Sequence, residues 1–446
     1  HNVSELNMKS EYSADNPTPR SDMRAKDIQV RLVVILALFV ISNSIQNQVF
    51  PKVCLDHFDG NDSKAARFLG WVQGASSILQ YLILPGLAAS SDTYGRQFIL
   101  MGSVLTQFFA LFVWSFVPDN IIVGSVTSIA CSLCWVIIPV CQAIISDLTR
   151  DQGASAAHSF GIISATFGLG LVIGPLLGGF LTDIHIYVAC FTAAGITFLA
   201  VAVAVVFKWK ETKISALPTE EVEENLSTTK FRNPFELFSK MKNNRQIIRM
   251  AVVYALSSVS LSVFSSWYVV LDWTFKWGPL RIGEFATCVG IAIAIVQSIV
   301  IRVLVPGLLP QSRAVVVSLG ILSTSLILYG LAFQGWQMYA ILPLMALGSV
   351  VEPCLQAMMA DSTPETLQGS LQGALYGLRI LAQGISSPLY GLLFSLGTSH
   401  SFSKFPLPGL SFLFASVSSF LGCVLSFKIR CKGREKQNAE QLLEPL

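Results

Sequence analysis

The chain has 446 residues, of which 52% are hydrophobic and only 13% are charged, and its formal net charge is +3. A soluble domain of this length does not need so much apolar material for one core, so the composition indicates a polytopic membrane protein. The small net charge argues against a basic nucleic-acid-binding surface, and we expect a lipid bilayer and no nucleic acid among its partners.

Twelve stretches of roughly 18 or more mostly apolar residues follow one another along the chain, each long enough to cross a bilayer as a helix. The predicted fold is therefore an all-α polytopic membrane protein with about twelve transmembrane helices. The stretches lie at about 31–50, 68–90, 97–117, 120–146, 158–182, 186–207, 247–271, 283–306, 313–333, 337–360, 368–396 and 408–428.

Lysine and arginine are concentrated before the first span, between the sixth and seventh spans, and after the last span. Because positive charge is retained on the cytoplasmic side, both termini are predicted to be cytoplasmic. The long polar connection divides the spans six and six. The predicted parts are an N-terminal tail (1–30), a first half (31–207), a linker (208–246), a second half (247–428) and a C-terminal tail (429–446).

Uncharged hydrogen-bonding side chains lie inside several spans, and in the first two spans they share one helical face. These side chains are candidates for the wall of a cavity that binds a hydroxyl-rich or zwitterionic solute. Hydrogen bonds to neighbouring helices are the alternative. The candidates are Asn43, Gln46, Asn47, Gln73, Gln80, Trp135, Gln142, Trp267 and Gln297.

The first outer loop carries Asn61-Asp-Ser63, a glycosylation sequon that the topology puts on the translocated side. Use of Asn61 would require a eukaryotic secretory route, and the plasma membrane and the endomembranes both remain open. The nine cysteines lie mostly in or beside apolar spans, where packing is expected. With no metal cluster, nucleophile or nucleotide loop in the sequence, we expect no enzyme, metal, cofactor or ATP-driven pump.

The first half contains two short motifs, one of which recurs in the second half. Asp92-x-x-Gly95-Arg96 fills a connection short enough to force a tight hairpin, in which Gly95 permits the turn. Gln142-Ala-x-x-x-Asp147 recurs as Gln356-Ala-x-x-x-Asp361 in the second half. A repeat of six helices about an axis along the membrane normal typically places a binding site at the interface of the halves, near the midplane.

The fifth span has glycines four residues apart at Gly170, Gly174 and Gly178, with Pro175 and Gly179 among them. Inside a membrane, neighbouring helices can satisfy the turn that lacks the proline amide, and the glycines form a bare stripe for close backbone contact. Helix packing alone is one interpretation of this pattern, and a transport motif is the other.

Two charged residues, Glu352 and Arg379, lie deep in the tenth and eleventh spans. A charge at a helix centre costs roughly 2.5–3.5 kcal/mol on insertion scales, so such residues are functional candidates by default. We expect them to pair, either as a static bridge or as a switch that responds to protons and solute. Glu352 is the acidic residue nearest to the midplane and the leading candidate for a proton carrier.

At these motifs the chain resembles the major facilitator superfamily and, within it, the tetracycline-efflux-like members. Phe275 to Gly283 and Gln368 to Arg379 look closest to the eukaryotic hippocampus-abundant-transcript-like branch. The resemblance implies alternating access between two halves, with Asp92, Arg96 and Asp147 as a cytoplasmic charge cluster. Capping of hairpins is the other interpretation of those three residues.

The expected function is therefore secondary transport of a small organic solute by a protein that we expect to be a monomer. The resemblance also implies a first-helix acid for proton antiport, but the chain has Phe39 at that position. Proton coupling would then depend on Glu352. The alternative function is a transporter-like sorting receptor or scaffold in the endomembrane system, without transport activity of its own.

Overall fold

The computed structural model describes residues 19–150, 156–206, 245–300, 310–363, 368–399 and 407–429, and all regular secondary structure in these ranges is helical. Most of the predicted linker (208–246) and most of both predicted tails lie outside the described residues.

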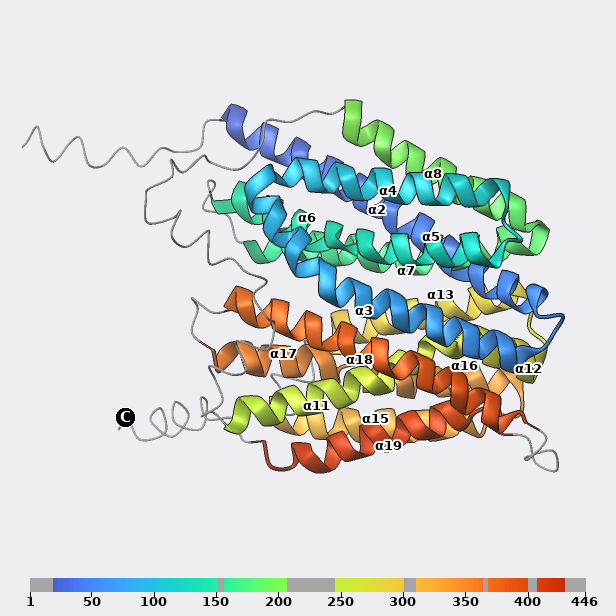
Figure 1. The fold of residues 1–446 in the computed structure, drawn as a ribbon. Coiled ribbons are helices and arrows are strands. Elements are labelled where there is room, and N and C mark those ends of the chain that lie inside the picture. The colour runs from blue at the N-terminus through green and yellow to red at the C-terminus, as the bar shows by residue number, and fades with distance from the viewer. Residues whose placement is uncertain are drawn as a thin grey trace, which may run out of the picture.

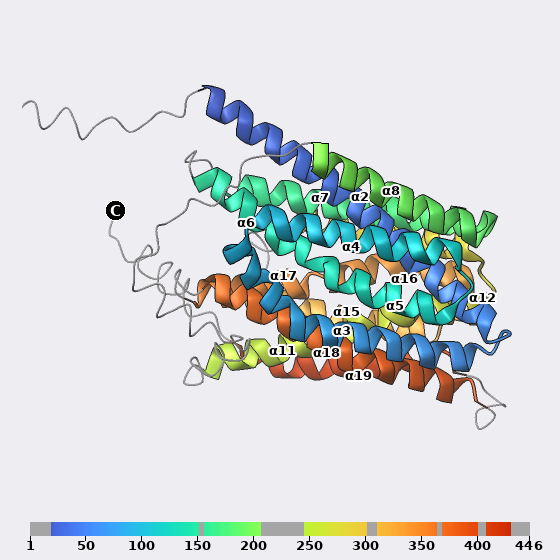
Figure 2. The same ribbon diagram turned by 45° about the horizontal axis from the view of Figure 1, so that its top comes forward.

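The helices form two groups that lie side by side, the first drawn in blue to green and the second in yellow to red (Figures 1 and 2). The first group is α2 (Pro19–His57), α3 (Asp62–Tyr94), α4 (Arg96–Phe116), α5 (Ile121–Leu133), η1 (Cys134–Val136), α6 (Ile137–Arg150), α7 (Ala156–Ile184) and α8 (Ile186–Val206). The second is α11 (Arg245–Leu261), η2 (Ser262–Ser266), α12 (Trp267–Phe275), α13 (Pro279–Ile295), η3 (Val296–Val300), α15 (Gln311–Gly330), α16 (Gly335–Gly348), α17 (Val351–Asp361), α18 (Gln368–Gly397) and α19 (Leu410–Ser426).

Helical residues occur at every predicted span, and ten helical stretches of the described chain are long and apolar enough to cross a membrane. This confirms a multi-pass membrane protein. The two remaining predicted spans correspond to α3, which is not among the ten, and to α19, which has 17 residues. Twelve crossings and cytoplasmic termini therefore stay predictions. The first residues of α2 and the last of α19 lie at one end of the bundle, opposite the α2–α3 connection (Figure 1).

Two predicted spans are interrupted at matching positions of the internal repeat. The first breaks at η1, between α5 and α6, and the other breaks at residues 349–350, between α16 and α17. A proline follows each break, Pro139 four residues after Trp135 and Pro353 four residues after Ser349. Because proline has no amide hydrogen, the carbonyls of Trp135 and Ser349 lose their helical partner. The repeat is thus Pro-x-x-Gln-Ala-x-x-x-Asp, three residues longer than predicted.

A third predicted span is interrupted between α11 and α12 by the serine-rich η2. The hydroxyls of Ser262, Ser265 and Ser266 each donate to a carbonyl three residues earlier, at distances of 2.6–2.8 Å. Local hydrogen bonds of this kind compete with the α-helical pattern. The serine hydroxyls thus satisfy backbone carbonyls at the break.

The glycine stripe of α7 packs against α2 within the first half. A Cβ at Gly170 would lie 2.6 Å from Val40, a Cβ at Gly178 would lie 2.9 Å from the Ile45 backbone, and one at Gly174 would collide with Ser44. The stripe thus allows α7 to approach α2 closely, as the spacing predicts.

Gly179, although next to Gly178, faces the second half. A Cβ there would lie 2.5 Å from the carbonyl oxygen of Pro279 and 3.1 Å from Gly283, both on α13. A similar approach joins α3 and α18, where a Cβ at Gly70 would lie 2.7 Å from the Ser387 carbonyl oxygen. These contacts occupy the parts of the four helices nearest to the α2–α3 connection, so the two halves are closely joined at that end.

Candidate functional site

Glu352 lies in the first turn of α17, directly after the break in the tenth predicted span, and is only 9% exposed. The break creates a helix N-terminus inside the second half. The amide groups there carry a partial positive charge, which favours a carboxylate in the first turn. Pro353 thus gives a buried acid a position that an unbroken apolar helix would not provide.

Two side chains from other helices contact the Glu352 carboxylate. Ser258 of α11 donates its hydroxyl hydrogen to Oε1 at 3.2 Å, and Arg379 of α18 places Nη1 3.4 Å from Oε2. One turn along α17, Gln356 donates to the hydroxyl oxygen of Tyr254 at 3.1 Å. The predicted pair is therefore formed, within a small polar cluster that ties α11, α17 and α18 together.

Arg379 differs from its partner in exposure. Its side chain is 55% exposed, whereas that of Glu352 is 11% exposed. Arg379 lies near the middle of α18, a 30-residue helix. Arg379 is thus an accessible cation within apolar helices, where a charged group is costly to bury in hydrocarbon.

The polar cluster reaches the first half through α18. Gln80 of α3 donates a long hydrogen bond of 3.5 Å to the hydroxyl oxygen of Tyr376, which lies three residues before Arg379. Residues three apart on a helix are neighbours on its surface. A contact between the halves therefore lies one helical turn from the exposed guanidinium.

The predicted amides occupy different environments. Asn43 and Gln46 are buried, whereas Asn47 is exposed and donates to Asn43 at 3.2 Å. Among the described residues, the Gln46 Nε2 atom is buried without a hydrogen-bond partner. Of the three amide side chains on this face of the first span, Asn47 is thus exposed, and Asn43 and Gln46 are buried.

The remaining cavity candidates also divide by exposure. Gln142 and Gln297 are exposed, and Gln73 is half-buried. Trp267 is buried, and its ring lies 4.5 Å from that of Phe285 in an edge-on arrangement. Its position fits packing within the second half. The structure shows no contact that joins these four residues to Glu352 or Arg379 in the described ranges.

The motif that contains Asp92, Gly95 and Arg96 is described in part. Gly95 joins α3 to α4 with φ +103°, a left-handed conformation that favours glycine, as predicted for the turn. Arg96 donates to the carbonyl oxygen of Ala143 on α6, one turn before Asp147. The side chains of Asp92 and Asp147 lie outside the described residues, so the predicted charge cluster stays a prediction.

At the opposite end of the bundle, the sequon residue Asn61 is exposed and caps α3 by accepting from the Lys64 amide at 3.1 Å. Burial raises the pKa of the neighbouring Asp62 carboxyl, and Lys276, which follows α12 in the other half, partly offsets this rise. Charged side chains of the two halves thus influence each other at this end.

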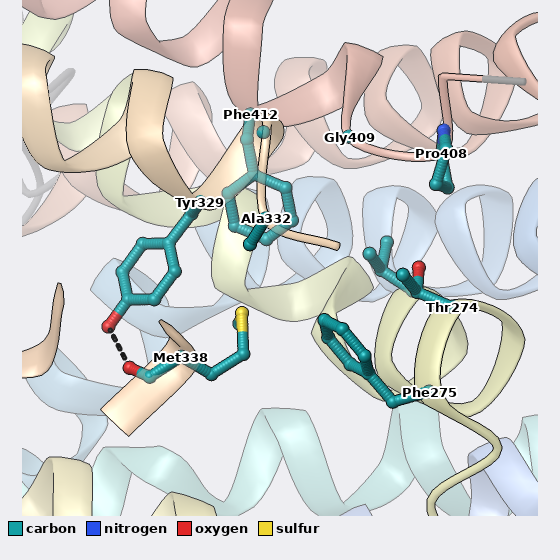
Figure 3. Close-up of a pocket in the computed structure, with 10 residues that line it drawn as sticks. Thr274, Phe275, Tyr329, Ala332, Met338, Pro408, Gly409 and Phe412 are labelled. Atoms are coloured by element: carbon teal, nitrogen blue, oxygen red, sulfur yellow. Dashed lines mark hydrogen bonds between the residues drawn. The ribbon is translucent and has the colours of Figure 1, made fainter. Parts of the chain in front are cut away.

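A small hollow in the second half, between α12, α16 and the α18–α19 connection, is a weaker candidate (Figure 3). Its residues come from within that half, none of them is charged, and the Tyr329 hydroxyl there donates to the Met338 carbonyl at 3.4 Å. Such a hollow offers nothing to hold a charged or strongly polar solute. Its lining consists of Val270, Thr274, Phe275, Tyr329, Gly330, Ala332, Met338, Pro408, Gly409 and Phe412.

The profile of the Major Facilitator Superfamily matches residues 32–387. The chain belongs to this superfamily. Its members are membrane transporters and not enzymes, so the expectation of a multi-pass transport protein is confirmed at the level of the family.

The sequence relatives confirm both branches of the predicted resemblance. Hippocampus abundant transcript-like protein 1 of Homo sapiens is 27% identical over 371 residues, covering 78% of this chain and 70% of the relative. The chain spans 63% of its counterpart from Rattus norvegicus. The class C tetracycline resistance protein of Escherichia coli is 26% identical, covering 82% of this chain and 89% of the relative.

Solved structures show the same fold. The human organic anion transporter MFSD10 superposes with a TM-score of 0.64 at 18% identity, covering 90% of this chain and 99% of the other. The nucleoside transporter NupG gives a TM-score of 0.66 at 11% identity, covering 90% and 98%. At such identities the likeness shows the fold alone.

Proposed function

We propose that this protein is a secondary transporter that moves a small organic solute across a membrane by alternating access, with Glu352 and Arg379 at the centre of its binding site. The observation that carries the proposal is an accessible arginine paired with a buried glutamate within apolar helices. Charges at such depth are retained in membrane proteins chiefly where solutes or protons pass.

The arrangement of the halves supports alternating access. At one end of the bundle the halves are joined along two seams, where the backbone of α7 lies close to that of α13 and the backbone of α3 lies close to that of α18. Arg379, at a different position on α18, remains accessible. Rocking of one half against the other around a fixed midplane site would expose that site at either end in turn.

We further propose that Glu352 carries the coupling proton. Phe39, at the position of the first-helix acid implied by the resemblance, is fully buried and packs edge-on against Trp135 at 6.1 Å. Glu352 can exchange a proton while Ser258 and the α17 N-terminus hold its carboxyl group.

The test begins by finding a solute. Purified protein is screened for thermal stabilisation by a library of solutes at two pH values, since a ligand of the folded state raises apparent stability. Solutes that bind are then followed in proteoliposomes under an imposed pH gradient. Glu352→Gln and Arg379→Ala are each expected to abolish gradient-driven transport, while size-exclusion profiles show that both variants fold.

Full transport by both variants would contradict the assigned site. If solutes bind but none crosses the membrane in either direction, the protein instead fits the alternative of a transporter-like sorting receptor.

A further inference from the structure

Most of the hydrogen-bonding capacity of Arg379 is unused. A guanidinium group carries five N–H donors. In the described part of the chain, its one charged or hydrogen-bonded partner is Glu352, and the 3.4 Å separation exceeds the roughly 2.7–2.9 Å of a charge-assisted hydrogen bond. The side chain is 55% exposed, so it is accessible to an incoming group.

Glu352 does not depend on Arg379 alone. Ser258 donates to its Oε1 atom, and the first turn of α17 offers the favourable end of a helix dipole. If an incoming group took over the guanidinium, the carboxylate would keep these two stabilising contacts. The loose pair can therefore exchange partners.

Arg379 is the positive charge at this pair, and the described residues around the pair add no second cation. Tyr254 from α11 and Tyr376 from α18 are the other titratable side chains that interact with Arg379 among the described residues. α15, which also packs on α17, has no titratable side chain between Arg313 and Tyr329. A single cation among hydroxyl and amide groups is matched by a solute with a single negative charge.

We infer that the transported solute is a small organic monoanion, whose carboxylate or similar oxyanion binds the Arg379 guanidinium in place of Glu352. This inference rests on the proposed function and names its substrate class. The planar guanidinium fork suits an oxyanion that accepts two hydrogen bonds at once. A bound anion would also lie one turn from the Gln80–Tyr376 hydrogen bond between the halves, so binding and the closure of the halves involve the same stretch of α18.

The test uses the purified full chain and three sulfonates of increasing size, namely methanesulfonate, benzenesulfonate and naphthalene-2-sulfonate. Each is compared with the uncharged sulfonamide of the same skeleton, with affinity read from thermal stabilisation. We expect at least one sulfonate to bind tenfold or more tightly than its sulfonamide, on the order of the effect of charge-assisted hydrogen bonds.

The variants separate the roles of the two charges. Arg379→Gln is expected to remove the preference for the sulfonate, a loss on the order of tenfold to hundredfold. Glu352→Gln keeps the shape and a partner for Ser258 but removes the competing charge, and is expected to tighten sulfonate binding. Arg313→Gln, at an exposed arginine in the first turn of α15, is the matched control and should bind as the wild type does.

Arg379→Gln leaves a buried carboxylate without its cation, so it is compared with the double variant that also carries Glu352→Gln, in which both charges are removed together. The inference is overturned if no sulfonate is preferred by the wild type, or if the preference persists in the double variant. Sulfonates that bind but are not exchanged by proteoliposomes would defeat the proposed transport and leave the anion site standing. Sulfonamides that bind and are exchanged as well as the sulfonates would overturn the anion site and leave the proposed transport standing.

Discussion

Gly174 is the residue at which α7 and α2 leave no room for a side chain, because a Cβ added there would overlap the side chain of Ser44. Gly168, six residues earlier on the same helix, has open space in the corresponding direction. The two glycines therefore differ in packing while sharing the conformational preference of a helical glycine. This contrast makes it possible to separate packing from helix propensity.

We predict that Gly174→Val lowers the free energy of unfolding by about 1–3 kcal/mol relative to Gly168→Val, the range for overpacking a close contact. Both variants introduce the same side chain into α7, so the difference reports the Ser44 contact. The measurement is the apparent melting temperature of the purified protein, together with the midpoint of unfolding in sodium dodecyl sulfate. Equal losses in the two variants would show that the stripe does not determine the packing of the first half.

Single residues also show where sequence reasoning reached its limit at the site. Glu352 and Arg379 could be found because a charge stands out in an apolar span. Ser258, which donates to Glu352, and Tyr254, which accepts from Gln356, could not be found, because hydroxyl side chains are common in such spans. Ser258 and Glu352 also lie 94 residues apart in the chain. Tyr376, three residues before Arg379, was within the matched branch motif, but its bond to Gln80 depends on how the halves pack.

At the scale of elements, the breaks in two spans were missed although their signal was present. Pro139 and Pro353 occupy equal positions in the internal repeat, and a proline removes one helical hydrogen bond wherever it falls inside a helix. A hydropathy window averages over such a residue, so it finds the span and not the break. The break matters because it places Glu352 at a helix N-terminus.

Gly179 differs from the glycine stripe because it lies on the seam between α7 and α13, whereas the stripe packs against α2. On this seam the Thr287 hydroxyl of α13 donates to the Val172 carbonyl of α7 at 2.8 Å, and Thr287 is 8% exposed. A larger residue at Gly179 would push against the Pro279 backbone across the boundary between the halves. The first half can keep its own packing while the seam opens.

We therefore predict that Gly179→Val shifts the protein away from this closed arrangement. The measurement is the rate at which a membrane-impermeant thiol reagent labels Thr287→Cys in a chain whose native cysteines are replaced by serine. Labelling should be at least about tenfold faster with Gly179→Val, corresponding to a shift of about 1.4 kcal/mol in the conformational equilibrium. Gly195→Val, at a glycine with open space around it, is the control. An unchanged rate would mean that Gly179 does not hold the seam.

At the scale of the whole molecule, the order of the helices could be predicted because spans and loops differ so strongly in composition. The closure of one end could not, since it depends on backbone approaches such as that of Gly70 to Ser387, which join distant parts of the chain. The absolute orientation is a separate question. It is predicted from the distribution of positive charge between the two sides of the membrane, and the packing of the helices does not determine it.

The orientation can be tested at two connections at opposite ends of the bundle. Asp59 is exposed in the α2–α3 connection, and Tyr94 is 76% exposed at the α3–α4 hairpin. We predict that glycosidase treatment lowers the apparent mass of the wild-type protein on a gel when the protein is made in eukaryotic cells. The same treatment should leave the apparent mass of Asn61→Gln unchanged. An extended loop with its own sequon should be glycosylated when inserted after Asp59 and should remain unmodified when inserted after Tyr94. Modification only after Tyr94 would invert the predicted topology, because glycans are added on the translocated side alone.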